Sequence, residues 1–144
     1  MAYYTVDTSV INSIKVFDLP DNFLFSAVVL LELIAGAKDE SERKRYEALA
    51  RAYRKDNSII VPSYDDWLLA SKILHWLSQD RKRKAGGKSP RSKPGATQRM
   101  ALDTLIAVSA RRWKATVVTN NWDDFKAIQH YCHVGLIQGS KVFK

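Results

Sequence analysis

The stretch MALDTLIAVSARRWKATVVTNNWDDF, residues 100–125, decides the fold. Residues 100–110 are apolar at most positions, which predicts a helix that is buried over most of its surface. Asp103 lies inside this apolar run. Residues 115–119 then predict a short buried strand, and residues 120–124 predict a polar loop at its carboxyl end. Because an unpaired carboxylate is costly to bury, Asp103 indicates a bound metal ion, for which the loop offers further oxygen ligands.

Short strand-like runs alternate with helical patterns along the rest of the chain. The predicted strands cover residues 3–6, 58–61, 115–119 and 133–137, and the predicted helices cover residues 8–15, 27–36, 39–55 and 65–77. This alternation is typical of an α/β fold with a mostly parallel central sheet and helices on both faces. The length of 144 residues suits one domain, residues 1–144.

The positive charge of the chain is concentrated in one segment. The sequence has 23 Lys and Arg residues against 15 Asp and Glu residues, and eight basic residues without an acid among them account for the whole excess. These residues are Arg81, Lys82, Arg83, Lys84, Lys88, Arg91, Lys93 and Arg99. Glycines and prolines predict an irregular loop at about residues 81–97. Such a loop indicates a polyanionic partner such as RNA, with a solvated insertion that binds nothing as the alternative.

Cysteine content and hydropathy indicate the compartment. No apolar run is long enough to cross a membrane, and the first apolar segment lacks the basic lead of a signal peptide. The single cysteine, Cys132, agrees with a reducing compartment, so we expect a cytoplasmic protein without a membrane partner. Cys132 lies between His130 and His133, but no second cluster completes a zinc site.

Acidic residues far apart in the sequence are expected to converge. Asp7 follows the first strand, at the sheet edge where ligands bind, although Asp is also a favoured helix N-cap. Glu32 is the one charged residue of its apolar helix, and a partly exposed position or a pair with a distant Arg is the alternative to ligation. With Asp103 and Asp124, these acids form an oxygen-only set that favours Mg²⁺ or Mn²⁺. Such a site beside a basic loop predicts a metal-dependent nuclease.

Four motifs follow one another along the chain. They are VDTSVIN at residues 6–12, SAVVLLELIAGA at 26–37, LDTLIAV at 102–108 and VVTNNWDDF at 117–125. Together they resemble the PIN-domain family, and most closely its VapC-type toxins. The resemblance implies a small three-layer α/β/α sandwich and an Mg²⁺- or Mn²⁺-dependent endoribonuclease that attacks RNA with a metal-activated water. It also implies a homodimer and a cognate antitoxin protein that holds the toxin inactive.

The resemblance also assigns roles to individual residues near the first strand and in two helices. Asp7, Glu32 and Asp103 match the metal-binding, catalytic acids of the family. Thr8 and Ser9 match the hydroxyl pair beside the first acid.

The fourth acid lies in the last motif. The family pattern Thr-x-Asn-x-x-Asp-Phe aligns with Thr119, Asn121, Asp124 and Phe125. Asp124 is then the fourth metal-binding, catalytic acid, and Asp123 is the reserve candidate. Asn121 stands where some members have an acid, so it contributes a neutral ligand or a hydrogen bond.

Residues 81–97 depart from the family pattern, in which this connection is short. The segment is either an RNA-binding element or a contact for a partner protein. Two alternatives to a toxin remain open: a housekeeping PIN ribonuclease that processes RNA without an antitoxin, and a catalytically silent RNA-binding module. Four acids at buried positions speak against the silent module, because binding alone does not need them.

Overall fold

A computed structural model of the chain describes residues 2–13, 19–87 and 94–142. Its central sheet has three parallel strands in the order β1-β4-β5, and β2 pairs with β3 in a second parallel pair. The strands are β1 (Tyr3–Val6), β2 (Phe25–Ser26), β3 (Ile59–Ile60), β4 (Ala115–Thr119) and β5 (Leu136–Gln138). Tyr4 bridges to Phe23 in parallel register, which joins the two sheets side by side. The predicted α/β class with a parallel sheet is confirmed.

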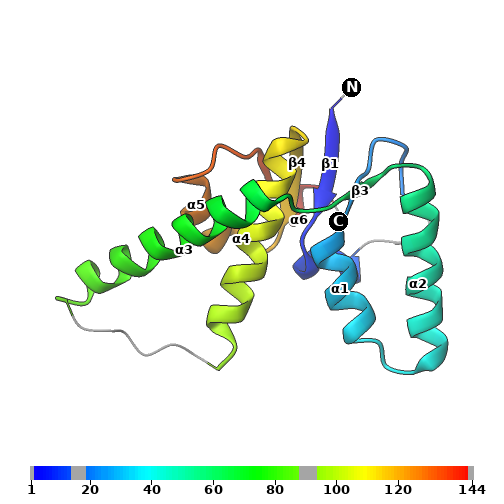
Figure 1. Cartoon of the computed structure of the whole chain (residues 1–144), viewed down its shortest axis with the longest axis horizontal. Helices are drawn as coiled ribbons and strands as arrows, with labels where there is room; N and C mark the ends of the chain where they lie inside the picture. The colour runs from blue at the N-terminus through cyan, green and yellow to red at the C-terminus, as the bar shows by residue number, and fades with distance from the viewer. Residues whose placement is uncertain (1, 14–18, 88–93, 143–144) are drawn as a thin grey trace.

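Helices cover both faces of the strands in a three-layer α/β/α arrangement (Figure 1). In that view α1 and α2 lie to one side of β1, and α3, α4 and α5 lie to the other. The helical elements are the 3₁₀ helix η1 (Thr8–Ser13), α1 (Ala27–Ala35), α2 (Glu40–Lys55), α3 (Tyr64–Lys84), α4 (Ala96–Arg112), α5 (Trp122–Gln129) and α6 (Gly139–Val142). Among the described residues, none of these helices is long and apolar enough to cross a bilayer.

Capping side chains set the ends of the first helices. Ser26 accepts a hydrogen bond from the backbone N–H of Val28 at 3.2 Å, and Asp39 accepts one from that of Glu42 at 2.8 Å. Gly36 follows the last residue of α1, as the sequence predicts. These local signals satisfy N–H groups that have no partner within the helix, which explains why the helix starts are readable from sequence.

The core lies between α4 and the central sheet. Residues 104–110 of α4 are all buried, and Val117 and Val118 of β4 are at most 2% exposed. Thr104 and Ser109 donate their hydroxyl protons to backbone carbonyls of the same helix, so burying them leaves no unpaired hydroxyl. The prediction of a buried helix followed by a buried strand is confirmed.

The predicted irregular loop at 81–97 is wrong at both ends. The helix expected to end near residue 77 continues to Lys84, because residues 78–84 contain no Gly or Pro and their basic residues suit a helix C-terminus. Gly86 and Gly87 then adopt positive φ angles and end it. The helix expected to start near residue 100 already begins at Ala96. Residues 88–93 lie outside the described part of the chain.

Other boundaries also differ from the prediction: the strand expected at residues 58–61, for example, is limited to Ile59–Ile60 in β3. The polar loop expected at residues 120–124 is limited to Asn120 and Asn121, because Asp123 and Asp124 belong to the first turn of α5, where acids favour a helix. The last strand begins at Leu136 rather than at residue 133. The strand β2 was not predicted, because it is only two residues long and carries no periodic signal.

Candidate active site

A cavity of about 660 Å³ opens where the carboxyl ends of β1 and β4 meet α1, α3, α4 and α5. We call it the acid cavity. Its lining residues are Asp7, Thr8, Ser9, Glu32, Arg81, Ala96, Arg99, Met100, Asp103, Asn120, Asn121 and Asp124. The four acids singled out in the sequence therefore lie in one cavity although they come from four different elements or junctions.

Asp7 is held at the end of β1. Its backbone N–H donates to the carbonyl of Val118 on the neighbouring strand, and its Oδ1 accepts a hydrogen bond from the Ser9 hydroxyl at 2.7 Å. Only 2% of Asp7 is exposed, and this burial raises the pKa of its carboxyl above the usual value. Hydrogen bonds from Ser9 and Thr119 act in the opposite direction, and the charge of Glu32 adds to the rise.

Glu32 faces the acid cavity from α1. Its Oε1 accepts a hydrogen bond from the Thr8 hydroxyl at 2.7 Å. The side chain is half-buried, and within the described residues it forms no ion pair with an Arg or Lys. Asp7, Asp103 and Asp124 also form no ion pair with an Arg or Lys in that part of the chain. The negative charge of the acid cavity is thus not compensated by paired basic side chains.

Asn121 connects the remaining two acids. Its Nδ2 donates to Oδ2 of Asp103 and to Oδ2 of Asp124, each at 2.9 Å. Burial, followed by the charge of Asp7, raises the pKa of Asp103 to about 7. The hydrogen bond from Asn121 opposes this rise, and the charges of Asp124 and Glu32 add to it. A carboxyl pKa that is raised by burial and by neighbouring carboxylates marks a candidate functional site.

The supporting residues predicted from sequence lie in different places. Thr119 is fully buried behind the acid cavity, where its Oγ1 accepts the backbone N–H of Asn121 at 2.9 Å. Asp123 is exposed and does not line the cavity. Asp124, and not this reserve candidate, therefore shares the cavity with the other acids.

Asn120 lines the acid cavity although the sequence did not predict it as a site residue. Its backbone N–H donates to the Ser9 hydroxyl at 2.9 Å, and its Nδ2 donates to the carbonyl of Ser9 at 3.3 Å. Gly139 makes room for it, since a Cβ there would lie 2.3 Å from Oδ1 of Asn120. The contact links residues more than 100 positions apart, so no local pattern could have revealed it.

The predicted basic residues divide into four groups. Arg81 and Arg99 line the acid cavity, from the last turn of α3 and the first turn of α4. Arg83 and Lys84 line the adjacent cavity together with Arg81, whereas Lys82 lines neither. The calls on Lys88, Arg91 and Lys93 lie outside the described residues.

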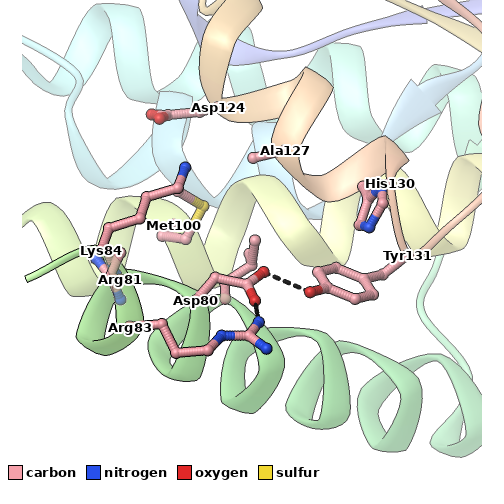
Figure 2. Close-up of a pocket in the computed structure, with 10 residues that line it drawn as sticks. Asp80, Arg81, Arg83, Lys84, Met100, Asp124, Ala127, His130 and Tyr131 are labelled. Atoms are coloured by element: carbon pink, nitrogen blue, oxygen red, sulfur yellow. Dashed lines mark hydrogen bonds and ion pairs between the residues drawn. The ribbon is translucent and has the colours of Figure 1, made fainter. Parts of the chain in front are cut away.

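The adjacent cavity has a volume of about 600 Å³ and lies between α3, α4 and α5 (Figure 2). We call it the Tyr131 cavity. Its lining residues are Leu77, Asp80, Arg81, Arg83, Lys84, Met100, Asp124, Ala127, His130 and Tyr131. It shares Arg81, Met100 and Asp124 with the acid cavity, so the two cavities adjoin.

The donor set of the acid cavity suits a hard divalent cation, because it consists of oxygens and carries excess negative charge. In the described ranges, however, no three His, Cys, Asp or Glu side chains are arranged to hold a metal ion as they stand. The amide of Asn121 lies between Asp103 and Asp124 and supplies the positive end of a dipole to both. The carboxylate oxygens are of the kind that binds Mg²⁺ or Mn²⁺, and the Asn121 amide occupies the position between two of them.

Comparisons with known proteins identify the family and the fold. The sequence profile of the PIN domain family matches residues 4–131. The DNA-bound VapBC structure from Salmonella typhimurium is 18% identical, with a TM-score of 0.56, and the match covers 96% of this chain and 99% of that one. VapBC-1 from nontypeable Haemophilus influenzae is 21% identical, with a TM-score of 0.55, covering 96% and 98%.

A third solved structure has the same architecture. VapBC-5 from Mycobacterium tuberculosis, a member of the VapBC family of toxin–antitoxin systems, is 22% identical, with a TM-score of 0.51 and coverage of 96% and 99%. At these identities the likeness shows a shared fold. A search of curated proteins found no match.

Proposed function

This chain belongs to the PIN domain family, and we propose that it is a metal-dependent endoribonuclease, the toxin of a type II toxin–antitoxin pair. The observation that carries the proposal is the convergence of Asp7, Glu32, Asp103 and Asp124 in one cavity without an ion pair in the described part of the chain. A protein that only bound RNA would gain nothing from this arrangement, because uncompensated carboxylates repel a phosphate backbone.

The four acids would hold Mg²⁺ or Mn²⁺. When bound, the ion supplies activation of a water nucleophile and neutralises charge at the phosphodiester. The chain's own residues orient the ligands: Thr8 holds Glu32 through its hydroxyl, and Ser9 holds Asp7. This fixed set of hydrogen bonds limits the reorganisation that binding and catalysis require.

Arg81 and Arg99 would bind the RNA backbone. Both line the acid cavity, and neither forms an ion pair within the described residues. A guanidinium binds phosphate oxygens through two parallel hydrogen bonds, which positions the backbone beside the acids. Arg81 and Arg99 offset the repulsion that the carboxylates alone would exert on the substrate.

A partner protein is supported by two observations. The solved structures of similar fold are VapBC complexes, and one is described as belonging to a family of toxin–antitoxin systems. In this chain, large apolar side chains are exposed before and along the first turns of α3: Val61, Tyr64, Trp67 and Leu68. Exposed apolar surface of this kind is typical of a protein interface. We propose that a cognate antitoxin or a second copy of the chain covers it.

The test is cleavage of total cellular RNA by the purified protein in Mg²⁺ or Mn²⁺ and in EDTA. Discrete products are expected with the metal ion, and none with EDTA or with Asp7→Asn. Asp21→Asn, which changes an exposed acid outside the acid cavity, is the matched control and should retain activity. Cleavage that persists in Asp7→Asn would contradict the proposal, and RNA retention without cleavage would favour a silent binding module.

The toxin role is tested separately in cells. Expression of the wild-type chain should arrest growth, and Asp7→Asn should relieve the arrest. A small open reading frame beside the gene should restore growth when it is co-expressed. Cleavage in vitro without growth arrest would instead favour a housekeeping nuclease that processes RNA.

A further inference from the structure

We propose that Asn120 is a positioning residue for Asp7. It acts through Ser9, whose hydroxyl it holds in place for the hydrogen bond to the Asp7 carboxylate. Gly139 supplies the space that the Asn120 side chain needs. The inference rests on the proposed function, since Asp7 is one of the acids that would hold the cation.

The Ser9 hydroxyl has one proton to donate, and its hydrogen bonds decide where that proton goes. The Ser9 oxygen accepts the backbone N–H of Asn120 at 2.9 Å and donates to Oδ1 of Asp7 at 2.7 Å. A hydroxyl group that is free rotates toward any acceptor within reach, and Thr119 Oγ1 lies 3.5 Å away as a competing one. The N–H of Asn120 occupies a lone pair of the Ser9 oxygen, which fixes that oxygen where its proton reaches Asp7.

The side chain of Asn120 makes a second hydrogen bond to the same residue. Its Nδ2 donates to the carbonyl oxygen of Ser9 at 3.3 Å. Asn120 thus binds both the hydroxyl and the backbone of Ser9, and two bonds fix an orientation that one bond would leave free to pivot. Asp7 is joined to the neighbouring strand as well, because its backbone N–H donates to the carbonyl of Val118 at 3.2 Å. The end of β4 therefore holds Asp7 through its backbone and, by way of Asn120 and Ser9, through its carboxylate.

Gly139 is required here for space and not for an unusual backbone conformation. It is buried at the start of α6, which packs against β4 and β5 (Figure 1). A Cβ at this position would lie 2.3 Å from Oδ1 of Asn120 and 2.7 Å from a methyl carbon of Val10, distances that real Cβ atoms do not show. Its φ is not positive, so Ala could adopt the same backbone. The missing side chain of Gly139 is what lets the C-terminal segment close against Asn120.

A direct contact with RNA is the other role open to Asn120, because this residue lines the acid cavity. The placement of its amide favours the positioning role. Its Nδ2 is bound to Ser9, and its Oδ1 lies against Gly139, so both polar atoms of the side chain face protein. A phosphate or base in the acid cavity would have to break these contacts to use the amide.

The decisive experiment is a double-mutant cycle on Mn²⁺ affinity, measured from the electron paramagnetic resonance signal of the free ion. Asn120→Ala should weaken Mn²⁺ binding by about tenfold, the size expected when a residue that orients a metal ligand is removed. Ser9→Ala should weaken it at least as much. Because Asn120 acts through Ser9, the double variant should bind Mn²⁺ no more weakly than Ser9→Ala alone.

Two matched controls separate positioning from a general loss of structure. Asn22→Ala removes the same kind of bond, from an amide Nδ2 to a backbone carbonyl at 3.0 Å, outside the acid cavity, and should keep the wild-type affinity for Mn²⁺. Gly139→Ala should reproduce the loss of affinity. Gly135→Ala, whose Cβ would lie 3.0 Å from Oγ1 of Thr116, should leave the affinity unchanged. The cycle between Asn120 and Ser9 decides the question even where Gly139→Ala fails to fold.

Cleavage assays add a second readout. Asn120→Ala should raise the Mg²⁺ concentration that gives half the maximal rate, while the KM for RNA stays at its wild-type value. A residue that touched RNA would raise KM instead, and a residue with a purely structural role would lower the melting temperature without changing the Mg²⁺ requirement. Either of these results would overturn the proposal.

Unchanged Mn²⁺ affinity in Asn120→Ala, or losses that add up in the double variant, would also overturn it. The wild-type protein separates this proposal from the proposed function. Mn²⁺ binding without RNA cleavage would refute the nuclease and leave the positioning role standing. RNA cleavage together with an unaffected Asn120→Ala variant would refute the positioning role alone. A wild-type chain that binds no Mn²⁺ would refute both.

Discussion

The Nδ2 atom of Asn121 lies 2.9 Å from Oδ2 of Asp103, a residue of the buried helix α4. The same nitrogen lies 2.9 Å from Oδ2 of Asp124. One amide thus holds two carboxylates together by presenting the positive end of its dipole to both. The divalent cation that we propose for the acid cavity would compete with the Asn121 amide for these two carboxylates.

Replacing Asn121 with Asp should make the fold more dependent on metal. The substitution removes the two donated hydrogen bonds and adds a carboxylate beside two others, so the metal-free protein should unfold about 2 kcal/mol more easily. Mg²⁺ should raise the melting temperature of this variant more than that of the wild type. Thermal unfolding with EDTA and with Mg²⁺ measures the difference. Asn22→Asp, a control away from the acid cavity, should show the same Mg²⁺-induced rise in melting temperature as the wild type. An equal rise in both variants would contradict the role of Asn121.

The stability of the metal-free protein should fall as pH rises from about 4 to about 7. The folded-state pKa of Asp103 is raised to about 7 from 3.8, so the folded protein binds more protons than the unfolded chain in this window. The raised pKa of Asp7 acts in the same direction. Since one pKa unit corresponds to about 1.4 kcal/mol, the free energy of unfolding should fall by roughly 4 kcal/mol at most through Asp103 alone.

Urea unfolding in EDTA at pH 5 and pH 8 measures this dependence. The Asp103→Asn variant should show a weaker dependence of stability on pH. At pH 8 it should be more stable than the wild type, because the substitution removes the buried charge. Mg²⁺ should restore stability to the wild type at pH 8 but not to this variant. A wild-type protein that is more stable at pH 8 than at pH 5 in EDTA would rule out the raised pKa.

Arg99→Ala should weaken RNA binding for all sequences to a similar degree. Arg99 lines the acid cavity and is exposed, so removing it deletes a phosphate contact and leaves the fold intact. The slope of log affinity against log salt should fall by about one. Fluorescence anisotropy over a series of salt concentrations, in the Asp7→Asn background, gives the slope. Arg51→Ala, on exposed α2, is the control and should leave the slope unchanged; an equal change in both would mean that only net charge matters.

Asp66→Ala should destabilise the fold without acting on the acid cavity. Asp66 is 6% exposed, accepts the backbone N–H of Ser63 at 2.9 Å and pairs with Nε of Arg112 at 2.9 Å, so it joins the start of α3 to the end of α4. Losing the hydrogen bond from the Ser63 N–H and the ion pair with Arg112 should cost about 2 kcal/mol. Chemical unfolding measures the loss. The exposed neighbour Asp65→Ala should cost far less, and equal losses would refute the link between the helices.

Local physics made much of the fold predictable. The strands at 3–6 and 115–119 were predicted at their observed bounds, because short β-branched and aromatic runs carry their own signal. The starts of α1 and α2 were predicted to within one residue, and the caps Ser26 and Asp39 act within three residues of them. The extended α3 and the first turn of α5 were missed, because basic and acidic residues there were interpreted as loop although they complement a helix end.

The sequence by itself determined the parallel α/β architecture and the chemical character of the candidate site, because both follow from periodicity and from acids placed among apolar residues. Only the tertiary structure decided which groups meet. It brings Asn120 to Ser9, places Asn121 between Asp103 and Asp124, and directs Asp123 to solvent. It also carries Arg81 on an extended helix to the acid cavity. These contacts depend on how α3, α4 and α5 pack against one another, and packing over such sequence separations leaves no local signal.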